Sequence, residues 1–111
     1  MEWTLDDQSL SGELKLVGDL NVEGVAHFKQ VALQAFNEAE EVTLNLEEVV
    51  NIDIAGLQII YACHRFGAAH QKQLVLQTGG NPAFARVVQE TGFLQWAIRS
   101  FGEEQLNVHL G

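Results

Sequence analysis

The chain has 111 residues, 47% of them hydrophobic, which is enough for one domain over residues 1–111 with a single core. Six Lys and Arg residues stand against fifteen Asp and Glu residues, so the net charge of −9 argues against nucleic-acid binding and favours a partner with a basic face. With Cys63 as the only cysteine and no apolar run near the roughly 20 residues that span a bilayer, we expect no intrachain disulfide, no membrane insertion and a cytoplasmic location.

Strands and a helix are predicted in the first half of the chain. Alternation of apolar and polar residues predicts short strands at 3–6, 14–17 and 42–46. Within 22–39, apolar residues recur at steps of three and four, which is the pattern of an amphipathic helix. The expected order is therefore strand, strand, helix, strand.

The segment 54–71 is too long for a strand and contains no proline, so it predicts a second helix. Projection at about 100° per residue places Ile59, Cys63 and Phe66 at the centre of its buried side. The opposite side carries Ile54, Gln58, Tyr61 and Arg65. Two large apolar side chains are thus expected on the side that faces solvent.

A third helix is predicted after a short strand at 74–76. Asn81 suits the cap that precedes a helix, and Pro82 is favoured at the first helical position. Gly92 is placed to end this helix in a left-handed conformation. Alternation over 106–110 suggests a last strand, so the order of elements predicts a mixed sheet with helices on it.

Residue types used in catalysis are present, but not in catalytic patterns. Cys63 and His64 are sequence neighbours, so on a helix their side chains point about 100° apart and form no nucleophile–base pair. The histidines do not have the spacing of a helical metal motif, and Gly79-Gly80 lacks the residues of a phosphate-binding loop. We therefore expect no enzyme activity, no cofactor and no metal.

The segment 51–58 has the features of a helix start that tolerates an anion. Asp53 suits the cap, and Ile54, Ala55 and Gly56 would form the first turn, whose backbone N–H groups lack partners within the helix. A hydroxyl in this turn could be phosphorylated, because the helix end would accommodate the added charge.

This segment resembles the signature of STAS domains, the anti-sigma factor antagonist family, in which Asp-Ser-Ser-Gly-Leu or Asp-Thr-Ser-Gly-Leu opens the helix. Asp53, Gly56 and Leu57 match that signature. Residues 18–20, Gly-Asp-Leu, are similar to the Gly-Glu-Leu that closes the family's second strand, and the element order matches over nearly the whole chain. The resemblance implies an α/β, STAS-like fold with a four- or five-stranded mixed sheet and helices packed mainly on one face.

The resemblance also implies a function, that of a non-catalytic protein–protein interaction domain in bacterial signal transduction. Ala55 stands where the family has its phosphorylated Ser, and a methyl group cannot accept a phosphoryl group. The module is therefore expected to lack the usual phosphoserine switch. The expected partner-binding residues are Asp53, Ile54, Ala55, Gln58, Tyr61 and Arg65.

Several partners are compatible with this resemblance. The leading hypothesis is an anti-sigma factor or its kinase, or another signalling protein such as one of a chemotaxis-like pathway. A second hypothesis is a STAS subunit of a lipid-trafficking ABC transporter, docking on the ATPase through the same surface. A third is a small-ligand sensor, which requires a closed apolar pocket with a few polar groups. A weak homodimer is also left open.

Overall fold

The structure is a computed structural model and describes residues 1–6 and 8–101. Its elements are β1 (Glu2–Asp6), β2 (Ser11–Leu20), α1 (Val25–Glu38), β3 (Glu41–Ile52), α2 (Ile54–Ala69), β4 (Gln73–Gln77), α3 (Pro82–Thr91) and α4 (Leu94–Phe101). Every helix and strand predicted before Gly92 is present, although β2 and β3 are longer than expected. The helix α4 was not predicted, and the strand expected at 106–110 lies outside the described residues.

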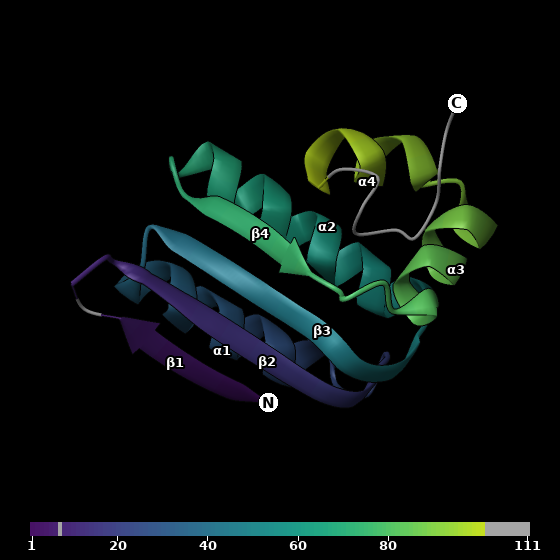
Figure 1. Cartoon of the computed structure of the whole chain (residues 1–111), viewed down its shortest axis with the longest axis horizontal. Helices are drawn as coiled ribbons and strands as arrows, with labels where there is room; N and C mark the ends of the chain where they lie inside the picture. The colour runs from purple at the N-terminus through teal and green to yellow at the C-terminus, as the bar shows by residue number, and fades with distance from the viewer. Residues whose placement is uncertain (7, 102–111) are drawn as a thin grey trace.

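The four strands form one mixed sheet in the order β1-β2-β3-β4. β1 runs antiparallel to β2, whereas β2, β3 and β4 are parallel to one another. The two parallel connections are made by α1 and α2, and Figure 1 shows both helices on the same face of the sheet. The predicted α/β architecture, a mixed sheet with helices mainly on one face, is thus confirmed, and the described strands number four.

The hydrophobic core lies between the sheet and these two helices. Leu14, Leu44 and Leu76 occupy one row across three strands, and all are buried. Most of the residues that alternate with them are polar, and on the other side of the sheet Lys15 of β2 forms a salt bridge with Glu48 of β3. Because buried apolar residues alternate with mainly polar ones, the strands could be predicted from the sequence.

The start and end of α3 follow the prediction. The Asn81 side-chain oxygen accepts a hydrogen bond from the backbone N–H of Ala83 at 2.9 Å, and Gly92 ends the helix with a φ of 80°. The Asn81 amide nitrogen also donates to the carbonyl oxygens of Leu46 and Val49, at 2.8 and 2.6 Å. Asn81 therefore fixes the start of α3 against the irregular second half of β3.

The side of α2 that faces the sheet differs from the predicted one. Its buried residues are Gly56, Leu57, Ile60, Cys63 and Gly67. Ile60 is 0% exposed, whereas Ile59 and Phe66 are only partly buried and lie on the flank toward α1. The burial of Cys63 is confirmed, but the predicted centre of the buried side was wrong by roughly a quarter of a turn.

Candidate partner-binding site

Asp53 joins the start of α2 to the end of β2. One carboxylate oxygen accepts a hydrogen bond from the backbone N–H of Gly56 at 2.9 Å, which confirms Asp53 as the helix cap. The other oxygen accepts from the backbone N–H of Val22 at 3.3 Å, and the Asp53 N–H donates to the Leu20 carbonyl. The carboxylate thus satisfies one free donor of the helix and also fixes the loop after β2.

Gly56 is required by how closely α2 approaches β2. A Cβ atom at this position would lie 2.4 Å from the carbonyl oxygen of Leu20, a distance that no side chain can tolerate. The next residue, Leu57, is 0% exposed in the core. Asp53, Gly56 and Leu57 therefore each have a structural role, as cap, close contact and core residue.

The other two residues of the first turn of α2, Ile54 and Ala55, are not buried. Ile54 is 52% exposed and Ala55 is partly exposed. Val22, whose N–H bonds to Asp53, is 70% exposed. We call Val22 and Ile54, on either side of Asp53, the apolar pair. Sequence reasoning missed Val22, because it placed this residue in the helix predicted over 22–39.

The second motif, Gly18-Asp19-Leu20, closes β2 beside this site. Gly18 has a φ of 88°, which favours glycine, and Leu20 is buried. Asp19 accepts a hydrogen bond from the side-chain nitrogen of Asn51 at 3.1 Å. The register between β2 and β3 shifts at this end of β2. Val50, at the same end of the sheet, is largely exposed.

The predicted outward stripe of α2 is only partly exposed. Gln58 and Arg65 face solvent, as expected. Tyr61 is only partly exposed, which differs from its predicted position on the solvent-facing side. Its ring packs edge-on against Phe93 and Trp96, with centroid distances of 5.8 and 5.0 Å. The structure therefore brings together Asp53, Ile54, Ala55 and Gln58, and covers Tyr61 with α4. The guanidinium carbon of Arg65 lies over the Tyr61 ring, 5.8 Å from the ring centroid.

The signal for α4 was present in the sequence. Leu94, Ala97, Ile98 and Phe101 recur at steps of three and four. The prediction placed no helix after Gly92, which ends α3, and so it did not include this short amphipathic segment. Recognising it would have predicted a further helix after Gly92, but not the element against which that helix packs.

Cys63 and His64 lie close together in the sequence, and burial governs the properties of both side chains. Burial raises the pKa of the Cys63 thiol to about 12, so it is not an activated nucleophile. Burial lowers the pKa of His64, which lies against the rings of Trp96 and Phe101. Within residues 1–6 and 8–101, no three His, Cys, Asp or Glu side chains form a group that could bind a metal ion.

Comparison with known proteins identifies the family. A family model described as Mlab, STAS domain, matches residues 3–99. The solved structure of the anti-sigma factor antagonist SpoIIAA in its unphosphorylated form is 17% identical, with a TM-score of 0.55, and the match covers 68% of this chain and 71% of that one. The crystal structure of Mglu is 20% identical with a TM-score of 0.57, over 66% of this chain but only 18% of that one.

These likenesses to solved structures establish the fold alone, because the identities are low. A comparison with curated proteins finds no match. In the described part of the chain, no helix is both long and apolar enough to cross a membrane.

Proposed function

Since this chain belongs to the STAS domain family, we propose that it is a non-catalytic bacterial signalling module that binds a protein partner in the cytoplasm through the start of α2. In this proposal, Asp53, Ile54, Ala55 and Gln58 form the binding surface together with Val22. Arg65 lies at its margin. Tyr61 acts indirectly, by supporting the outer side of the helix under α4.

The exposure of the apolar pair is the observation that carries this proposal. Leaving Val22 and Ile54 in water forgoes the roughly 1.5–3 kcal/mol that burial of such a side chain provides. Both are held in place, because the Asp53 carboxylate bonds to the backbone on each side. A rigid apolar contact of this kind suits the centre of an interface, where burial contributes most to affinity.

The partner chemistry follows from the charges around the apolar pair. Asp19, Glu23 and Asp53 are exposed nearby, and the whole chain carries a net charge of −9. The complementary surface has an apolar centre and a basic rim, which also accelerates association. An anti-sigma factor or its kinase, a chemotaxis-like signalling protein and a transporter ATPase remain the three partner classes to be distinguished.

The absence of a phosphoserine switch is the second part of the proposal. Ile54 and Ala55 occupy the two positions where the family has hydroxyl residues. Ala55 presents the small neutral surface that a dephosphorylated Ser would present, so binding is constitutive. Any control of the complex then acts through the partner or through another site.

Calorimetric titration of purified candidates from the three partner classes tests this proposal. Ile54→Ser should weaken the complex at least about tenfold, because it removes a large apolar side chain from the interface. The matched control is Leu10→Asn, an exposed leucine beyond the other end of β2 whose φ of 54° asparagine tolerates. Equal affinity of wild type and Ile54→Ser, or an equal loss in both variants, would place the interface elsewhere.

A further inference from the structure

A pair of aromatic rings separates α1 and α2 at one end of their contact. The rings of Phe36 and Phe66 lie 5.6 Å apart between centroids and are inclined at 46°. Gly67 makes room for Phe36, because a Cβ atom there would lie 3.3 Å from its ring. The two rings fill the space between the helices at this end and set the distance between them.

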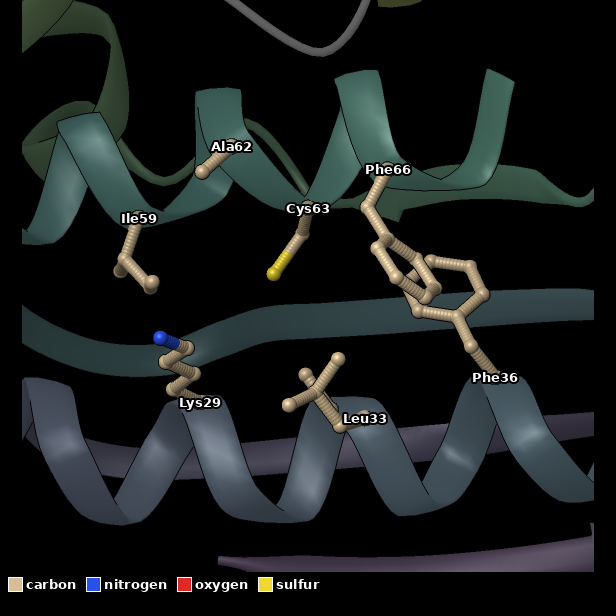
Figure 2. A pocket seen from close by; sticks show the side chains of 8 residues that line it. Lys29, Leu33, Phe36, Ile59, Ala62, Cys63 and Phe66 are labelled. Carbon is tan, nitrogen blue, oxygen red and sulfur yellow. The ribbon is translucent and has the colours of Figure 1, made fainter. Parts of the chain in front are cut away.

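Beyond this pair, small side chains leave the space between the helices unfilled. Ala32, Ala62 and Cys63 contribute few atoms, and Leu33 and Ile59 form the sides. Figure 2 shows the Cys63 sulfur and the Leu33 and Ile59 side chains directed into this space. The result is a groove with a volume of about 130 Å³, open to solvent along one side.

The size and lining of the groove define the kind of group that fits. Apart from Lys29, the described residues that line it contribute only hydrocarbon and a thiol. An apolar cavity of roughly 150 Å³ is known to hold benzene, so a groove of about 130 Å³ accommodates a ring or a chain of five to six carbons. Water gains little there, since a bound water needs polar partners.

Lys29 supplies the one charge at the groove. Figure 2 shows its amino group near Ile59, at the end away from the Phe36–Phe66 pair. Among residues 1–6 and 8–101, no carboxylate lies within ion-pairing distance of this amino group. The net charge of −9 disfavours anions over the chain as a whole. At the groove, the Lys29 amino group provides a local attraction for an anion.

From these features we propose that the α1–α2 groove binds a small amphiphilic carboxylate, with its apolar tail toward Phe36 and Phe66 and its carboxylate at the Lys29 amino group. The site lies on the flank of α2 that faces α1, apart from the apolar pair. It therefore does not depend on the protein-binding role, and it gives the small-ligand hypothesis a definite place and chemistry. The groove is half open rather than closed, which suits a ligand whose head stays in water.

NMR titration of the whole chain with hexanoate and with 1-hexanol tests this site. Both ligands should shift the amide signals of Leu33, Ile59 and Cys63 in a saturable way, with a Kd on the order of 1 mM for ligands of about eight heavy atoms. Lys29→Gln should weaken hexanoate binding by roughly two- to fivefold and leave 1-hexanol unchanged. The control Arg86→Gln removes an equal charge from the exposed side of α3 and should change neither.

Filling the groove gives an independent test. Cys63→Leu adds apolar atoms where the sulfur now points, so it should abolish binding of both ligands while the melting temperature stays near that of wild type. If this variant does not fold, Ile59→Phe fills the groove from the other end of the lining. Shifts that do not saturate, binding by a folded filled variant, or an equal loss for both ligands in Lys29→Gln would overturn the proposal.

Discussion

Gly56 lies where α2 approaches the end of β2 closely, and some of its neighbours have structural roles while others are exposed. Asp53 caps the helix and Leu57 enters the core, so each keeps the fold whatever the partner is. Ile54 and Ala55 neither cap the helix nor enter the core. The cap could be predicted from sequence because it is a local hydrogen bond. The need for glycine could not, because its contact is with Leu20, far away in the chain.

The close contact predicts the effect of Gly56→Ala. In an unobstructed helix this change stabilises by roughly 0.5–1 kcal/mol, because alanine restricts the unfolded chain. Here the new methyl group would collide with the Leu20 carbonyl oxygen, and we expect a loss of about 1–3 kcal/mol or more. Chemical denaturation measures the free energy of unfolding. A neutral or stabilising effect would show that α2 can move away from β2 without cost.

At the scale of elements, α2 has apolar neighbours on three sides. Ile60 faces the sheet, Ile59 faces α1, and Tyr61 lies under α4. The length of the segment 54–71 and its lack of proline therefore predicted a helix, but the helical projection did not reveal which apolar side faces the core. Strands with one largely polar face gave no such ambiguity, since β2 and the first half of β3 carry their buried apolar residues at every second position.

Truncating Ile59 and Ile60 in turn shows which side of α2 contributes more to stability. Ile60→Ala should lower the free energy of unfolding by about 2–5 kcal/mol, because it leaves a cavity in the core. Ile59→Ala should cost distinctly less, since its side chain lines a groove that is already partly open to water. Both changes in the free energy of unfolding are obtained from the midpoints of chemical denaturation, with the same dependence on denaturant concentration in each variant. A larger loss for Ile59→Ala would restore the helix orientation first predicted from sequence.

At the scale of the whole molecule, the connections through α1 and α2 bring distant residues to one end of the sheet. Val22 follows β2, Ile54 follows β3, and Asn81 anchors the loop after β4 at the irregular part of β3. This meeting point follows from the connections that the structure shows, because parallel strands end at the same edge of a sheet. The cover over Tyr61 and the α1–α2 groove were not predictable, since both depend on how helices distant in sequence pack together.

The central claim is that a partner binds constitutively at the start of α2. Ala55→Glu should leave the melting temperature nearly unchanged, because a carboxylate at a helix N-terminus contributes at most about 1 kcal/mol. At the interface it would add bulk and a charge that must lose its water, which costs about 2 kcal/mol or more, a loss of roughly 30-fold in affinity. Ala55→Ser is the matched control and should bind like wild type until it is phosphorylated.

The most direct measurement is the affinity of a purified partner for wild type, Ala55→Ser and Ala55→Glu by calorimetry, with a thermal melt of each variant. We predict three similar melts, equal affinities for wild type and Ala55→Ser, and a loss of about 30-fold or more for Ala55→Glu. Binding of folded Ala55→Glu with the affinity of wild type would contradict the account, because the first turn of α2 would then lie outside the interface.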